Sequence, residues 1–242
     1  MTEEDPRLSK AAKLVAEGAF DAAVELLFDA WSSDTGNLDL AVSYACLLAR
    51  VGRQPEAEEL FATLAGESPS DNRVWNNWGY LLLERGDAAG AIVRLEQALA
   101  IAPDDFEALV NLGIALDRDG QTEAALKRYR HATAINPDSP VAFNNLGAAL
   151  WRSGKANEAL EAFRSALALN PRDASAANNM GIIKMAEGDL EEASAYFRQA
   201  LKIDPDSLAA KRNLEAAGER IRRAKKQAPG KEKKCETPPS LF

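Results

Sequence analysis

Glycine recurs at a fixed spacing of 34 residues along most of this 242-residue chain. The series is Gly18, Gly52, Gly86, Gly120, Gly154 and Gly188. An alanine follows five residues after each glycine, and in every unit but the first a proline follows twelve residues after the alanine. Such a period indicates an array of similar supersecondary units that bury their apolar faces against one another. The consecutive units are residues 4–37, 38–71, 72–105, 106–139, 140–173 and 174–207.

Two helices are predicted in each unit. In the unit 106–139, apolar residues such as Leu109, Leu112 and Leu116 lie three and four positions apart, which is the helical period. The periodic glycine ends the first helix because it adopts a left-handed backbone without strain, and the proline ends the second because it has no amide hydrogen. Small residues on the first helix are expected to face alanines on the second and to let the two axes approach closely. These pairs are Gly79 and Ala91, Gly113 and Ala125, Gly147 and Ala159, and Gly181 and Ala193.

Both ends of the array depart from the repeat. The first unit has Arg7 and Lys10 where apolar residues are usual and Thr35 in place of the proline, which is typical of a solvent-facing cap. Residues 208–226 begin like another first helix and then become strongly charged, so they are predicted to form a closing helix. Residues 227–242 have too little apolar content to order themselves and are predicted to form a disordered basic tail. The expected domains are therefore a solenoid over 1–226 and this tail.

Charge is divided unevenly along the chain. Residues 1–207 contain 19 Lys and Arg against 33 Asp and Glu, whereas residues 208–242 contain 10 against 4. An acidic body repels phosphate backbones, so a nucleic-acid partner is not expected.

The cysteine content and the N-terminal sequence bear on the compartment. Only two cysteines occur, Cys46 and Cys235, which are too few for a disulfide framework. No run of about 18 apolar residues occurs, as a membrane span would need. The N-terminus is acidic and lacks an apolar stretch. We expect a soluble, cytoplasmic protein that does not insert into membranes.

The repeats resemble a known family, the tetratricopeptide repeat. Its pattern is carried most closely by the fifth unit, through Phe143, Leu146, Gly147, Leu150, Ala159, Phe163, Ala166 and Pro171. The resemblance covers residues 4–207 and implies an all-α fold. The expected architecture is a right-handed α-solenoid of six 34-residue helical hairpins plus a C-terminal capping helix. It also implies a protein that binds other proteins rather than an enzyme.

Residues capable of catalysis or metal binding are scarce. The single histidine, His131, has no serine, cysteine or carboxylate set placed to partner it, and it is interpreted as an exposed helix residue. Cys46 is interpreted as an apolar filler and Cys235 as a bystander thiol. No phosphate-binding glycine loop or metal-ligand spacing occurs. We therefore predict no catalytic residues, no metal and no cofactor.

One polar series is not explained by the repeat architecture. Asparagines lie 34 residues apart at Asn77, Asn111, Asn145, Asn179 and Asn213, and further asparagines, Asn76, Asn144 and Asn178, directly precede three of them. The series is similar to the asparagine ladder in the superhelix of O-linked N-acetylglucosamine transferases, whose catalytic domain this chain lacks. That resemblance implies a concave groove in which asparagine amides, with two donors and an acceptor, hold the backbone of an extended peptide. Side-chain selectivity is expected from Tyr80, Arg118, Trp151 and Arg152.

Three alternatives accompany this hypothesis. The asparagines can instead satisfy neighbouring groups within the fold. The chain can instead be a structural scaffold that associates with itself through convex faces or ends, or that fills the groove with its own Thr-Pro-Pro-Ser-Leu-Phe tail. A carboxylate clamp of the kind that holds chaperone C-termini is disfavoured, because the clamp positions are occupied by Glu107, Asn111, Val141 and Asn145, none of which is basic.

Overall fold

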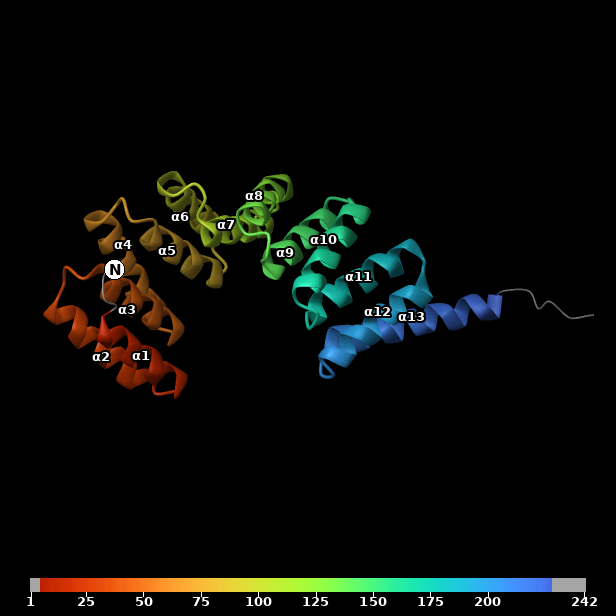
Figure 1. Ribbon diagram of the computed structural model, residues 1–242, viewed down its shortest axis with the longest axis horizontal. Helices are drawn as coiled ribbons and strands as arrows, with labels where there is room; N and C mark the ends of the chain where they lie inside the picture. Colours follow the sequence, from red (N-terminus) through yellow and green to blue (C-terminus); the bar gives the residue numbers. More distant parts are fainter. Residues whose placement is uncertain (1–4, 228–242) are drawn as a thin grey trace, which may run out of the picture. The chain divides into compact units, whose positions relative to one another are not determined.

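The computed structural model describes residues 5–227, and this part of the chain consists of thirteen α-helices without a strand (Figure 1). The prediction of an all-α repeat of helical hairpins is confirmed. The helices are α1 (Pro6–Ala16), α2 (Phe20–Ser33), α3 (Leu38–Arg50), α4 (Gln54–Glu67), α5 (Asn72–Glu84), α6 (Ala88–Ile101), α7 (Phe106–Arg118), α8 (Thr122–Ile135), α9 (Pro140–Arg152), α10 (Ala156–Leu169), α11 (Ala174–Glu187), α12 (Leu190–Ile203) and α13 (Leu208–Gln227).

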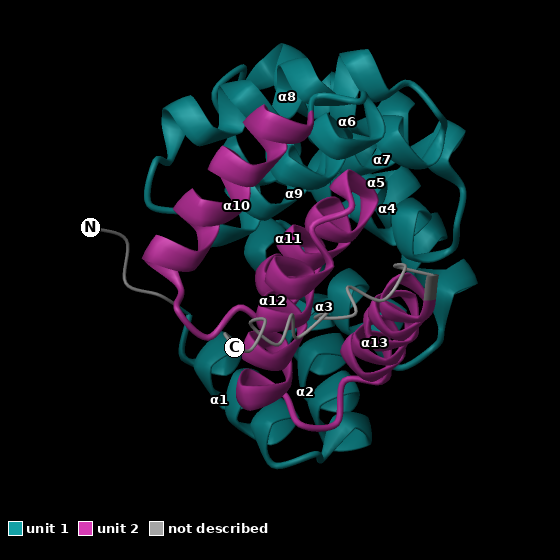
Figure 2. Cartoon of the chain, turned by 90° about the vertical axis from the view of Figure 1, so that its right-hand side faces the viewer, with its two compact units in different colours: residues 1–155 teal, residues 156–242 magenta. Residues whose placement is uncertain are grey.

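The chain forms two compact units, residues 1–155 and residues 156–242 (Figure 2). The first contains α1 to α9 and the second α10 to α13. Within each unit every helix packs against the next one along the chain. The predicted tail, apart from Gln227, and Cys235 lie outside the described residues.

The periodic glycines end the first helix of each hairpin as predicted. All six have positive φ, from 75° at Gly154 to 89° at Gly188. Among the described residues, none other than glycine has a positive φ. A side chain in this region of backbone space is strained, whereas glycine is not. The second helices end two residues before the periodic prolines, as α6 does at Ile101 before Pro103.

A second periodic signal, which the sequence analysis did not use, begins the first helices. The residue before each of these helices accepts a hydrogen bond from a backbone N–H of the first turn, and such residues recur every 34 positions at Asn37, Asp71, Asp105, Ser139, Asp173 and Ser207. Asp105 does more than cap α7. One of its oxygens accepts from Ala108 N at 2.8 Å, and the other accepts from Nδ2 of Asn72 at 2.6 Å. This carboxylate therefore joins two successive repeats.

The glycines in the middle of the first helices have close partners on the second helices. A Cβ built on Gly79 would lie 2.5 Å from Cγ of Leu95, and one built on Gly181 would lie 2.5 Å from Cε1 of Phe197. Gly113 is closed in the same way by the ring of Tyr129. The nearest side chain to each of these glycines is thus the large residue sixteen positions later, which the sequence did not predict. Helical side chains lean towards the N-terminus of their helix, so this large residue covers the turn that precedes it.

Candidate functional site

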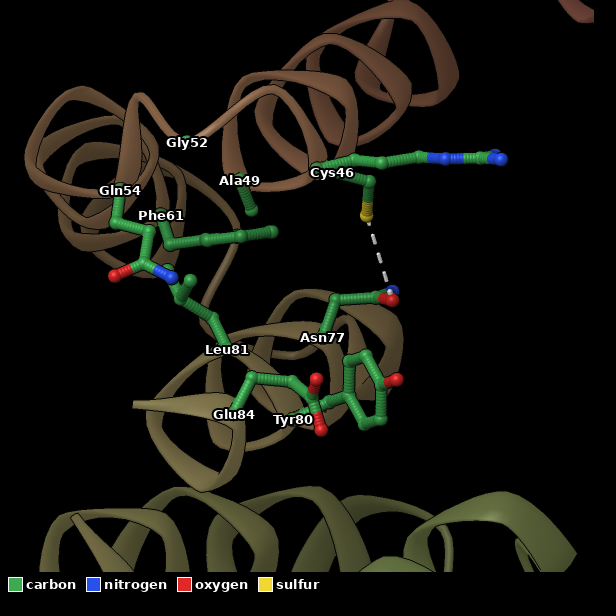
Figure 3. A pocket seen from close by; sticks show the side chains of 10 residues that line it. Cys46, Ala49, Gly52, Gln54, Phe61, Asn77, Tyr80, Leu81 and Glu84 are labelled. Carbon is green, nitrogen blue, oxygen red and sulfur yellow. Dashed lines mark hydrogen bonds between the residues drawn. The ribbon is translucent and has the colours of Figure 1, made fainter. Parts of the chain in front are cut away.

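The first unit contains a hollow of about 740 Å³ between α3, α4 and α5, which we call the α3–α5 hollow (Figure 3). Phe61 and Leu81, 1% and 3% exposed, form an apolar floor. Arg50 and Glu84 bring opposite charges to its rim, and Tyr80 stands half exposed beside it. The full lining is Cys46, Ala49, Arg50, Gly52, Gln54, Phe61, Asn77, Tyr80, Leu81 and Glu84.

A smaller hollow of about 320 Å³ lies between α5 and α7. We call it the α5–α7 hollow. Phe106, Glu107, Val110 and Asn111 line it from α7, and Asn76, Asn77 and Tyr80 line it from α5. Because Asn77 and Tyr80 border both hollows, the two hollows are adjacent, and we call them together the recess.

The asparagines at this recess make hydrogen bonds within the chain. Nδ2 of Asn77 donates to the backbone carbonyl of Arg73 at 2.8 Å, and its Oδ1 accepts from the thiol of Cys46 at 3.5 Å. Nδ2 of Asn111 donates to Oδ1 of Asn76 at 3.0 Å, and Asn76 is only 6% exposed. In the second unit Nδ2 of Asn213 donates to Oδ1 of Asn178 at 2.9 Å.

These hydrogen bonds stabilise the fold, but they leave some donors and acceptors of each amide free to bind a ligand. An asparagine side chain has two N–H donors and an oxygen with two lone pairs. The bond from Asn111 to Asn76 uses one N–H, so the oxygen of Asn111 and its second N–H remain at the α5–α7 hollow. A structural role and a ligand-binding role are therefore compatible at this position.

The two arginines expected to select ligands are engaged with neighbouring repeats. Nη1 of Arg118 donates to the carbonyl oxygen of Leu83 at 2.6 Å. Arg152 pairs with Asp117 through Nε at 3.1 Å and through Nη2. Both bonds link residues 35 positions apart, as the Asn111–Asn76 bond does, so these arginines fix the packing of adjacent first helices.

The remaining predicted residues are distributed over three helices. Asn144, Asn145 and Trp151 are half-buried on α9, Asn178 and Asn179 are half-buried on α11, and Asn213 is half-buried on α13. The recess itself brings together Asn76, Asn77, Asn111 and Tyr80 from the predicted set.

The recess also includes residues that were not predicted as site residues, namely Arg50, Phe61, Glu84 and Phe106. The 34-residue spacing could have identified part of this set. Cys46 and Tyr80 occupy the same position in successive repeats, and so do Arg50 and Glu84. Cys46 lines the α3–α5 hollow, and burial raises the pKa of its thiol to about 11. The thiol is therefore neutral at ordinary pH and serves as a weak donor rather than a nucleophile.

The described residues also bear on metal binding, on the single histidine and on membrane insertion. No group of three or more His, Cys, Asp or Glu residues there is placed to hold a metal ion. His131 lies on the surface with Nε2 at 2.8 Å from Oδ1 of Asp104. None of the helices within residues 5–227 has the length and apolar character needed to cross a membrane.

Comparison with solved structures gives close matches of fold. PilW, a type IV pilus biogenesis factor, matches with a TM-score of 0.77 at 23% identity over 86% of this chain and 96% of its own. YrrB, described as a TPR protein with an unusual peptide-binding site, matches with a TM-score of 0.65 at 21% identity over 79% and 99%. The Cut9–Hcn1 structure of the APC/C matches with a TM-score of 0.75 at 17% identity, and this chain spans 42% of the matched chain. At these identities the likeness concerns the fold alone.

Comparison at the level of sequence identifies the family. FlbA of Caulobacter vibrioides is 39% identical over 64 residues, which are 26% of this chain and 11% of FlbA. Models of the tetratricopeptide repeat match residues 14–76, 82–150 and 144–207. The chain thus belongs to the tetratricopeptide repeat family, whose members are in general non-catalytic modules for protein–protein interaction.

Proposed function

We propose that this protein is an adaptor that binds an extended segment of another polypeptide along the recess formed by α3, α5 and α7. The observation that carries the proposal is the pair of hollows on either side of Tyr80, each bordered by asparagine amides. Binding sites are typically concave and largely apolar, with a few polar groups that fix orientation. This recess combines those two properties.

The asparagines contribute contacts to the peptide backbone. Neighbouring helices pack about 8–10 Å apart, and an extended chain advances about 3.3 Å per residue, so one asparagine serves about every third peptide residue. Asn77 offers its second N–H to a peptide carbonyl, and Asn111 offers Oδ1 to a peptide N–H. Asn145 continues the series within the first unit, and we include it as a further contact. Asn179 and Asn213 present the same amide on α11 and α13 of the second unit, and we include each as a peptide contact within that unit.

Tyr80 and the α3–α5 hollow contribute side-chain selectivity. The buried floor of Phe61 and Leu81 suits an apolar peptide side chain, and the exposed ring of Tyr80 covers it from one side. Arg50 and Glu84 at the rim favour polar or zwitterionic neighbours in the peptide over a long apolar run. Glu107 at the α5–α7 hollow disfavours an acidic residue there.

The expected affinity is modest. Each backbone hydrogen bond contributes about 0.5–1.5 kcal/mol, and the ordering of a flexible peptide opposes binding. Together with one buried side chain, these contributions correspond to micromolar dissociation constants.

The test uses a phage-displayed library of random peptides, with selected sequences then measured by fluorescence anisotropy on the full chain. The double variant Asn77→Ala/Asn111→Ala should weaken all selected peptides about tenfold, whatever their sequence, because it removes backbone contacts. Tyr80→Ala should instead change which peptides are selected. Equal binding by the double variant would contradict the asparagine contacts.

Asn76→Ala is the matched control, because Asn76 is only 6% exposed and its Oδ1 already accepts from Asn111. It removes the same internal bond to Asn111 but leaves the amide of Asn111 in place, so it separates weakening of the fold from loss of a ligand contact. Circular dichroism confirms that each variant is helical. If no peptide is enriched above a displayed scrambled set, the recess is not a peptide site.

A further inference from the structure

A separate hollow of about 270 Å³ lies on α2, α3 and α4 of the first unit. Phe28, Trp31 and Tyr44 form its aromatic part, with ring centroids 5.8 Å apart for both Phe28–Tyr44 and Trp31–Tyr44. Phe28 is 48% exposed. We call this hollow the aromatic notch; its lining is Phe28, Trp31, Tyr44, Leu48, Glu56, Glu59, Leu60 and Thr63. It shares no residue with the two hollows of the recess.

The rim of the aromatic notch is acidic. Glu56 and Glu59 lie on the same exposed face of α4, three residues apart. Glu56 pairs with Arg53, and Glu59 makes no side-chain ion pair among the described residues. The surrounding sequence, residues 20–67, contains nine Asp and Glu against two Arg and no Lys. An exposed aromatic surface thus lies within a strongly negative region.

Arginine is the side chain that best fits this combination. A guanidinium group stacks on aromatic faces and at the same time donates several hydrogen bonds to carboxylates, whereas an ammonium group is compact and more strongly hydrated. The chain already uses such stacking, with Cζ of Arg94 at 4.1 Å from the ring centroid of Trp78 and Cζ of Arg50 at 5.4 Å from that of Phe20. The aromatic notch presents rings and carboxylates without an arginine in its lining.

The chain also carries exposed arginines on α13, and we call Arg222 and Arg223 the arginine stripe. Residues 208–227, which form α13, contain seven Lys and Arg against two Glu. Arg222, Arg223 and Lys226 share one face of its last turns with Glu219 and line a shallow surface depression. The side chain of Arg223 is 75% exposed and holds only a 3.4 Å contact to Glu219.

We propose that the aromatic notch of one molecule binds the Arg222–Arg223 stripe of a second copy, so that the chain associates head to tail. The acidic N-terminal helices and the basic C-terminal helix supply the charge complementarity, and Phe28 and Trp31 supply the stacking surface. Because two different surfaces meet, the contact is heterologous and leaves one notch and one stripe available on each dimer for further copies. The association is expected to be weak and to weaken with added salt, since its charges are exposed. This proposal does not depend on the peptide-binding function.

Sedimentation velocity over a range of concentrations at low salt tests the proposal. The wild-type chain should show a concentration-dependent rise in sedimentation coefficient. Glu56→Lys/Glu59→Lys and Arg222→Glu/Arg223→Glu should each weaken association at least tenfold. An equimolar mixture of these two variants should associate again. The unchanged stripe of the first variant meets the unchanged notch of the second, and the reversed notch and reversed stripe also have opposite charges.

Two further variants sharpen the result. Arg222→Lys/Arg223→Lys keeps the charge but removes the stacking and should associate more weakly than wild type. Glu96→Lys/Asp138→Lys makes the same net charge change at exposed sites away from the notch and should leave association unchanged. A monomer at all concentrations overturns the proposal, as does association that survives both reversals or a mixture that stays monomeric.

Discussion

The contact between Gly181 and Phe197 makes a quantitative prediction about packing. Gly181 lies in the middle of α11, and a Cβ at this position would meet the ring of Phe197 at 2.5, 2.7 and 3.0 Å. Phe197 is fully buried, so its ring has no free space to enter. The substitution Gly181→Ala therefore forces the two helices apart or moves the ring out of its preferred rotamer.

The magnitude follows from two opposing contributions. Overpacking of a buried contact costs about 1–3 kcal/mol, and the short distances place this case in the upper half. Replacing a mid-helix glycine by alanine stabilises the helix by about 1 kcal/mol. The net effect is a loss of about 1–2 kcal/mol. Gly218→Ala is the matched control, because Gly218 lies within α13 of the same unit and an added Cβ there meets nothing within 4 Å. It should stabilise the protein by about 1 kcal/mol.

Urea unfolding followed by far-ultraviolet circular dichroism measures both variants. The data are fitted with nearest-neighbour coupling between repeats, since arrays of this kind need not unfold in one step. A double variant, Gly181→Ala/Phe197→Leu, should be more stable than the sum of the two single effects, because the smaller side chain makes room for the methyl group. Equal stability of Gly181→Ala and Gly218→Ala would refute the reasoning.

Three further predictions concern other positions. The pKa of Cys46 is about 11 in the folded chain against an ordinary 9.0, so the unfolded chain releases this proton first and the free energy of unfolding falls as pH rises from 9 to 11. Urea titrations in a Cys235→Ser background should show this decline, and the decline should be smaller in Cys46→Ala, where other groups such as Tyr129, whose pKa is also raised by burial, still contribute; parallel curves would contradict the buried thiol. Asp105→Ala removes the cap of α7 and its bond to Asn72, and should cost about 0.5–2 kcal/mol with faster amide exchange at Ala108; unchanged exchange there would count against the cap. Gly120→Ala places a side chain at a φ of 82° and should cost about 1–2 kcal/mol, so a raised melting temperature would argue against left-handed strain.

The architecture was predictable because its determinants are local and periodic. A glycine that must adopt positive φ and a proline that cannot donate a hydrogen bond act within a few residues of their own position, so a 34-residue spacing of both defines the helix ends. The cap series beginning at Asn37 was equally periodic and was overlooked. Its signal, a short polar residue directly before an apolar helix, was available in the sequence.

The side-chain partners were less predictable because they depend on how helices pack. Ala193 was expected opposite Gly181, but the ring nearest to Gly181 is that of Phe197, one turn further along the helix, and this contact was not predicted. The asparagine register was visible, but the bond from Asn111 to Asn76 joins residues in successive repeats and requires the helices to be docked. The α3–α5 hollow arises from residues of three helices, so its shape could not be read from any single stretch of sequence.

The bond between Asn72 and Asp105 has a consequence for how such a chain can change its length. Asp105 ends one 34-residue unit while capping the first helix of the next, and Asn72 begins the unit that Asp105 ends. Because caps of this kind recur every 34 residues before the first helices, a gene segment encoding 34 residues can be copied or lost from any starting point within the array, and each first helix that follows keeps a cap in front of it. The breakpoint need not coincide with a helix boundary. Unequal recombination between repeats would then yield foldable proteins of different lengths in a single event, without a second mutation to repair the junction.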